Sequence, residues 1–182
     1  KSDTFESGGW AQTIFSWYGI PYSVTYDYDR DGIYALGGSQ ALERLSDDDI
    51  RKILSHRVII DGQAARELVK RGFADLIGAE ISGEDVLFTG ERSEINGDGL
   101  SLPRSSRPPV PGAKTLSSLI WRESAYAKEF ERVTPSAVLY RNRLGGSVVV
   151  MSYHFGLGVS YLYSEARRQF VCDMLDAVNG GA

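Results

Sequence analysis

The sequence has a single cysteine and two histidines among its 182 residues. One thiol cannot form a disulfide within the chain, and two histidines with one distant cysteine do not make a standard structural zinc site. The cysteine, Cys172, stands beside Phe170, Val171 and Leu175 in a helical pattern, which is typical of a small buried hydrophobe. The fold needs no stabilising disulfide or metal, since a chain of about 150 residues already buries roughly 68–70% of its unfolded surface. We therefore expect one domain over residues 1–182, with no metal and no cofactor.

An excess of positive charge and a long apolar run are missing as well. The net charge of −4 gives no electrostatic footprint for nucleic acid or an anionic membrane, and no stretch reaches membrane-spanning length. Because no signal peptide is present, a soluble, cytoplasmic protein is favoured. The first residue is Lys1 rather than Met, so we expect a piece of a larger protein whose neighbouring domains are its partners.

The most informative segment that is present is an apolar run, residues 58–60, which passes through Asp61-Gly62 directly into a helical pattern reaching Lys70. This order predicts a buried strand, a tight turn and a helix. In an open α/β sheet such a turn lies at the carboxyl end of a strand, where helix N-termini and backbone N–H groups face a ligand-binding crevice. The side chains that this turn offers are Asp61 and Gln63, with no cysteine or serine among them.

Further patterns complete an α/β fold. Helices are predicted over residues 10–18, ending at Gly19, over a stretch that begins at the N-cap Ser46, and over residues 160–178. Strands are predicted over residues 22–26, 33–36, 115–121, 137–141 and 147–152, with a β-rich insertion over residues 81–95. We expect a mainly parallel sheet with residues 58–60 central and an antiparallel hairpin, residues 137–151, towards one edge.

This order of elements resembles the class I glutamine amidotransferase-like domain, which has a three-layer, flavodoxin-like α/β fold. Two stretches carry the resemblance: residues 58–72, and residues 144–154 followed by the helix with Arg167 and Arg168. The chain looks most like the non-catalytic versions appended to bacterial glycoside hydrolases, such as the trimerisation domain of family 42 β-galactosidases. The resemblance implies an accessory domain of a carbohydrate-active bacterial protein.

The catalytic signatures of that family are replaced in this chain. Catalytic members place a cysteine in a Gly-x-Cys-x-Gly turn after a central strand, where nearby N–H groups stabilise the oxyanion. The corresponding turn here, residues 61–64, reads Asp-Gly-Gln-Ala. The second signature, His-x-Glu after a late strand, is His154-Phe-Gly, so the orienting carboxylate is missing. We expect no cysteine-dependent glutamine hydrolysis, and His154 is either a general base oriented from elsewhere or a structural histidine.

A run of alternating aspartates, Asp27, Asp29 and Asp31, stands before Gly32 and matches the opening of a calcium loop. An EF-hand would need a bidentate Glu at its twelfth position, which is Gly38 in this chain. We expect a hydrated acidic turn at the ligand-facing end of a strand, without a high-affinity metal.

Three functions remain open. The first and favoured one is a non-catalytic accessory or interaction domain of a larger, carbohydrate-active protein, acting through neighbouring domains or as a homo-oligomer. The second is a hydrolase that uses a crevice around Asp61, Gln63 and His154. The third is a small-ligand or sugar-binding module, because tyrosine and tryptophan side chains suit sugar rings as well as protein interfaces. Its candidate contacts are Asp27, Asp29, Asp31 and Tyr153.

Overall fold

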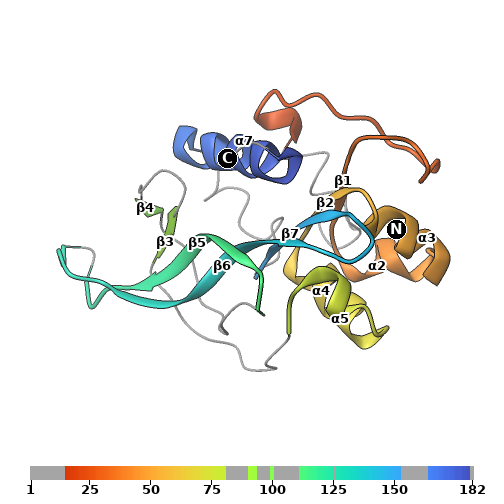
Figure 1. Cartoon of the computed structure of the whole chain (residues 1–182). Coiled ribbons are helices and arrows are strands. Elements are labelled where there is room, and N and C mark those ends of the chain that lie inside the picture. Colours follow the sequence, from red (N-terminus) through yellow and green to blue (C-terminus); the bar gives the residue numbers. More distant parts are fainter. Residues whose placement is uncertain are drawn as a thin grey trace.

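A mixed sheet of seven strands forms the centre of the computed structural model, which describes residues 15–80, 90–93, 99–100, 111–124, 126–152 and 164–180. The strands follow the order β1 (Ile33–Leu36), β2 (Arg57–Ile60), β7 (Ser147–Met151), β6 (Glu131–Arg141), β5 (Lys114–Trp121), β3 (Gly90–Ser93) and β4 (Gly99–Leu100). The pairs β1–β2 and β2–β7 are parallel, and the remaining four pairs are antiparallel. The sheet is therefore parallel at its β1 end and antiparallel at its β4 end (Figure 1).

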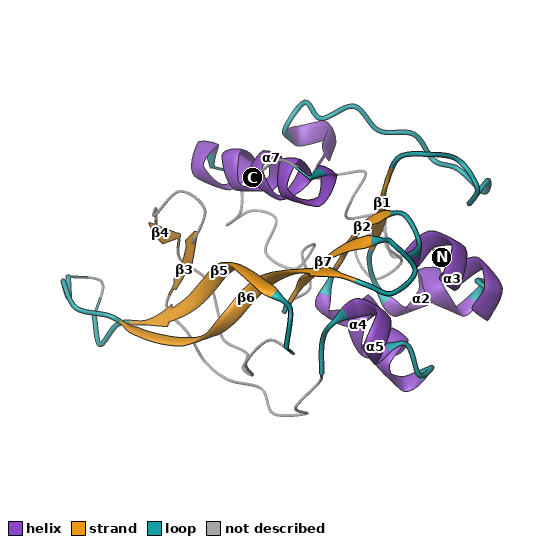
Figure 2. Ribbon diagram, in the orientation of Figure 1, coloured by secondary structure: helices purple, strands orange, loops and turns teal. Residues whose placement is uncertain are grey.

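Helices cover both faces of the parallel strands. They are α2 (Ser39–Glu43), α3 (Asp47–Leu54), α4 (Gly62–Lys70), α5 (Ala74–Ile77) and α7 (Glu165–Asn179). Helix α7 shares one core with Ile59 and Val149, whereas α3, α4 and α5 share a second core with Val58 and Ile60. Figure 2 shows α7 on one side of the strands and α4 and α5 on the other. Among the described residues, no helix has the length and apolar character needed to cross a membrane.

Residues 58–60 form a buried strand, β2, which is the second strand from the edge of the sheet rather than the central one expected. Val58, Ile59 and Ile60 are at most 2% exposed, and β1 and β7 pair with β2 on its two sides. An unbroken apolar run suits a strand with both faces covered, because successive side chains point into different cores. The strand, turn and helix over residues 57–70 form as the sequence indicates.

The expectation of a mainly parallel sheet is wrong, although the α/β class is confirmed. The predicted hairpin forms as β6 and β7, but it lies in the middle of the sheet rather than towards an edge. The reason is that β5, β3 and β4 pair in turn beyond β6, so the β-rich segments extend the same sheet by antiparallel pairing. The flavodoxin-like topology stays a prediction.

The predicted strand over residues 22–26 is not formed, and these residues are a loop. Tyr22, Val24 and Tyr26 are 47%, 63% and 87% exposed, so these alternating side chains do not pack against a core. The β-propensity of such side chains describes their fit to a pleated, half-buried surface, and that surface is missing at this place.

The helix before this loop ends where the sequence predicts. Residues 15–17 are helical, and Gly19 follows with a φ of 67°. The Ile20 N–H donates to the Phe15 carbonyl (2.8 Å) and the Gly19 N–H to the Ser16 carbonyl (3.2 Å), the bonds of a Schellman cap. The earlier part of the predicted helix lies outside the described residues.

Candidate functional site

Asp61 lies at the carboxyl end of β2, where the sequence places a ligand-binding crevice, and its side chain is fully buried. Its carboxylate accepts hydrogen bonds from two backbone N–H groups, that of Ala64 at 2.8 Å and that of Gly38 at 3.1 Å. Its own N–H donates to the Leu36 carbonyl at 3.1 Å. Asp61 therefore caps the N-terminus of α4 and ties it to the loop after β1, so its oxygens serve the fold at this edge.

The other members of the proposed hydrolase crevice are not brought to Asp61 by the described structure. Gln63 is half-buried in the first turn of α4. His154 lies outside the described residues, as does Tyr153, the candidate ligand contact next to it. A carboxylate that is occupied by backbone N–H groups and a neutral amide do not make an acid–base pair, so the described part of this crevice lacks catalytic groups.

Two serines at the same end of the sheet were missed by the sequence analysis. Ser136 on β6 stands opposite Ser152, whose N–H donates to the Ser136 carbonyl at 2.7 Å. Both hydroxyls are buried and have no hydrogen-bond partner among the described residues. Ser152 directly follows the carboxyl end of β7, and Ser136 lies beside it on the antiparallel strand β6. The only sequence signal was a serine directly after the apolar run of β7.

The acidic loop, residues 27–31, was expected at the ligand-facing end of a strand, but it lies at the opposite end of the sheet. It leads into β1, and Arg57, the first residue of β2, pairs with Asp31, so the loop is beside the amino ends of these strands. Asp29 pairs instead with Lys52 on α3 at 2.8 Å, and Asp27 accepts a hydrogen bond from the Asp29 N–H at 3.2 Å. The carboxylates therefore turn towards different partners rather than towards one ion.

These contacts shift the pKa values of several side chains in and around the acidic loop. The Arg57 guanidinium donates to Asp31 and holds the pKa of this carboxyl below its usual value. The hydrogen bond to Asp29 raises the pKa of Lys52. Tyr34 donates to the Arg30 carbonyl at 2.6 Å, and burial raises the pKa of the Tyr34 hydroxyl. In the parts of the chain that the structure describes, no cluster of three or more His, Cys, Asp or Glu side chains is placed to hold a metal.

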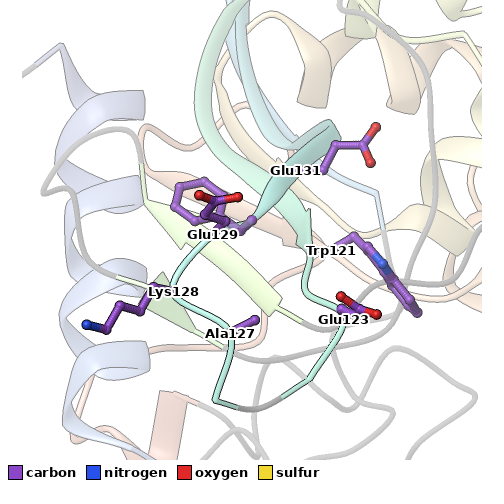
Figure 3. A pocket seen from close by; sticks show the side chains of 7 residues that line it. Trp121, Glu123, Ala127, Lys128, Glu129 and Glu131 are labelled. Carbon is purple, nitrogen blue, oxygen red and sulfur yellow. The ribbon is translucent and has the colours of Figure 1, made fainter.

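An open pocket of about 520 Å³ lies at the far end of the β5–β6 hairpin. It is lined by Trp121, Glu123, Ala127, Lys128, Glu129, Phe130 and Glu131. Figure 3 shows the charged side chains spread around the hairpin end rather than converging on one point. An aromatic ring with scattered carboxylates gives no defined place for a reacting atom.

Comparison with known proteins adds no assignment to this geometry. No family model matches the chain, and no curated protein or solved structure matches it either. The amidotransferase resemblance therefore rests on the sequence pattern, and the function is argued from the described residues.

Proposed function

We propose that the chain is a non-catalytic interaction domain, an accessory part of a larger carbohydrate-active protein, that assembles with further copies of itself. One observation carries this proposal. Five of the seven large hydrophobic side chains that are exposed in the described residues lie between positions 17 and 33. They are Trp17, Tyr22, Val24, Tyr26 and Ile33. Exposed apolar side chains that gather in one region mark interaction sites, whereas scattered ones need no explanation.

We call Tyr22, Val24 and Tyr26 the apolar loop. The Tyr22 ring packs on Phe15, with ring centroids 6.4 Å apart, and its hydroxyl accepts from the Ser16 hydroxyl at 3.2 Å. The preceding helix is fixed to α7, because Arg168 Nε donates to the Tyr18 carbonyl at 3.1 Å. An exposed aromatic side chain that is already held in place, such as Tyr22, loses little conformational entropy on binding, which favours an interface.

A second copy is the partner we propose. The apolar loop leads into β1, which is the first strand of the sheet and pairs with β2 alone among the described strands. An open strand edge beside exposed aromatic side chains suits association between copies. The resemblance to a trimerisation domain points in the same direction. The bonds that occupy Asp61 support a role without catalysis.

Sedimentation velocity tests the proposed assembly. The chain should sediment as an oligomer at micromolar concentration, and a variant with Tyr22→Ser, Val24→Ser and Tyr26→Ser should sediment as a monomer with an unchanged melting temperature. Tyr126→Ser is the matched control, since Tyr126 is 96% exposed and lies elsewhere, on the β5–β6 hairpin. A monomeric parent chain, or an oligomer that the triple variant leaves intact, would contradict the proposal.

A small-ligand module is the second candidate, favoured by the buried hydroxyls of Ser136 and Ser152. They lie beside the carboxyl end of β7, and open α/β sheets bind ligands at the carboxyl ends of their parallel strands. Melting the chain with a panel of monosaccharides at millimolar concentration tests it. A stabilising sugar whose effect is lost in Ser136→Ala would support this candidate, and the absence of any shift across the panel would count against a sugar ligand.

A further inference from the structure

Three residues form a row across neighbouring strands at the amino ends of β2 and β7. Arg57 on β2 pairs in register with Ser147 on β7, and Ser147 pairs with Arg141 on β6. Neighbouring strands lie about 4.8 Å apart, so the two arginines flank the serine at a backbone separation of about 10 Å. All three side chains are on the α7 face of the sheet, because Ile59 and Val149, two residues further along their strands, pack in the core with α7.

A cavity of about 420 Å³ opens over this row. Its other walls come from the end of α7, the β6–β7 turn and the segment before β2. The residues concerned are Asp31, Ser55, His56, Gly145, Val178, Asn179 and Gly180. This volume falls in the range of about 300–1,000 Å³ that is typical of small-molecule sites.

The two arginines differ in what they contact. Arg57 is held from two sides, by the Asp31 carboxylate and by the Asn179 side-chain oxygen at 2.5 Å. Its positive charge is therefore balanced within the protein. Arg141 is exposed, and its contact with the Ser147 hydroxyl, at 3.5 Å, is at the limit of a hydrogen bond. Among the described residues, no carboxylate lies within ion-pair distance of Arg141.

Arg141, whose charge is not balanced by a described carboxylate, has a hydrogen-bond donor beside it. The Ser147 hydroxyl is buried between the two arginines. The His56 imidazole is half-buried and packs on the Tyr34 ring of β1, with centroids 5.5 Å apart, so it belongs to the wall beside Asp31. A guanidinium can donate to two oxygens of one tetrahedral anion and a neighbouring hydroxyl to a third, whereas a planar carboxylate presents only two oxygens.

We propose that this pocket at the amino ends of β2 and β7 binds the phosphate group of a small organic phosphate. Arg141 supplies the charge-assisted contact, Ser147 supplies a further donor, and Arg57 with Asp31 forms the fixed wall. The site lies at the opposite end of the strands from the crevice at Asp61, and it does not depend on the proposed assembly. It adds a ligand to a domain for which the amidotransferase resemblance implies none.

Calorimetric titration of the whole chain with phenyl phosphate and with benzoate tests the site at low salt. These two probes share a ring and differ in the anion. Phenyl phosphate should bind, benzoate should bind at least about tenfold more weakly, and Arg141→Gln should lower the phenyl phosphate affinity at least about tenfold, as expected for one charge-assisted contact. Ser147→Ala should lower it by a smaller factor.

Arg143→Gln is the matched control, because Arg143 is an exposed arginine two residues away that pairs with Asp75 outside the pocket. Its affinity for phenyl phosphate should equal that of the parent chain. Equal affinity for benzoate, no binding of phenyl phosphate, or equal losses in Arg141→Gln and Arg143→Gln would each overturn the proposal. Melting curves of both variants show whether they fold.

Discussion

Asn142 is a buried amide at the start of the β6–β7 turn that uses its whole hydrogen-bonding capacity. Its Nδ2 donates to the carbonyls of Leu54 (2.8 Å) and Leu76 (3.0 Å), and its Oδ1 accepts from the N–H groups of Leu144 (3.0 Å) and Gly146 (3.1 Å). One side chain thereby joins the ends of α3 and α5 to the turn. A fully satisfied buried group of this kind specifies a single arrangement of the elements around it.

Asn142→Ala should destabilise the fold by about 3 kcal/mol, because it leaves several buried backbone groups without a partner. Urea unfolding followed by circular dichroism gives the free energy of unfolding. Gln169→Ala is the control, since this exposed amide bonds only to Asp173 one turn away, and its effect should stay within about 0.5 kcal/mol. An Asn142→Ala effect as small as that of the control would show that the four bonds contribute little.

Ser136 and Ser117 are buried serines that should respond in opposite ways to loss of the hydroxyl. Ser117 Oγ accepts from the Ala137 N–H at 3.0 Å, whereas the Ser136 hydroxyl has no partner in the part of the chain that the structure describes. Ser136→Ala should therefore leave stability unchanged or raise it by about 1 kcal/mol, and Ser117→Ala should lower it by about 1–2 kcal/mol. Urea unfolding of both variants measures the difference. A marked loss of stability in Ser136→Ala would reveal a contact that this hydroxyl makes in solution.

Helix α3 begins with a capping box that carries a pH dependence. The Ser46 backbone N–H and hydroxyl donate to Asp49 (3.1 and 2.6 Å), and the Asp49 N–H donates to the Ser46 hydroxyl at 3.1 Å. The two Ser46 bonds hold the pKa of Asp49 below its usual value of 3.8. Because the folded state favours the ionised carboxyl, the stabilisation is complete above this usual value and is lost as the pH falls through the lower folded pKa.

Asp49→Asn should therefore melt below the parent chain near neutral pH, and the gap should narrow at about pH 3 and below. Thermal melts across this pH range provide the measurement. Asp48→Asn removes a negative charge from the same turn without touching the capping box, and its gap should be smaller near neutral pH. A gap for Asp49→Asn that stayed constant down to pH 2 would mean that Asp49 ionisation does not contribute.

The acidic loop is a second element with a defined response to cations. Asp29 and Asp31 already pair with Lys52 and Arg57, so excess calcium should not raise the melting temperature above that measured with a chelator. A site that binds with a Kd 100 times below the free calcium concentration would add about 2.7 kcal/mol, which is readily visible. Such a shift, if it disappeared in Asp29→Ala, would make this loop a calcium site.

Short-range signals predicted much of this fold, and long-range contacts account for the rest. The cap at Ser46, the turn at Asp61 and the end of the last helix at Gly180 each depend on a few neighbouring residues. The residues of the apolar loop alternate as in a strand, but no described strand pairs with them. The local pattern therefore predicted a strand that does not form. The second bond of Asp61, to Gly38, spans 23 residues and has no local signature. The row of Arg57, Ser147 and Arg141 exists only through the strand order.

At the scale of the whole molecule, the sheet has two ends with different chemistry. At the carboxyl ends of β2 and β7, the buried carboxylate of Asp61 caps α4, and the buried hydroxyls of Ser136 and Ser152 lie beside the end of β7. At the amino end, arginines and a histidine line an open cavity. Of these two ends, the amino end is the one where the described residues line a cavity with charged side chains, and it is opposite to the usual binding side of an open α/β sheet.

The whole chain should release no ammonia from glutamine. A cysteine amidotransferase needs a thiolate beside N–H donors at the carboxyl end of a central strand. There the N–H groups of Gly38 and Ala64 already bind Asp61, and the sole thiol, Cys172, is on α7, which packs on the face of the sheet opposite to α4. A coupled ammonia assay, with an active amidotransferase as positive control, measures the release. Ammonia production above the uncatalysed rate that vanished in Cys172→Ala would place the thiol within reach of substrate and refute the non-catalytic assignment.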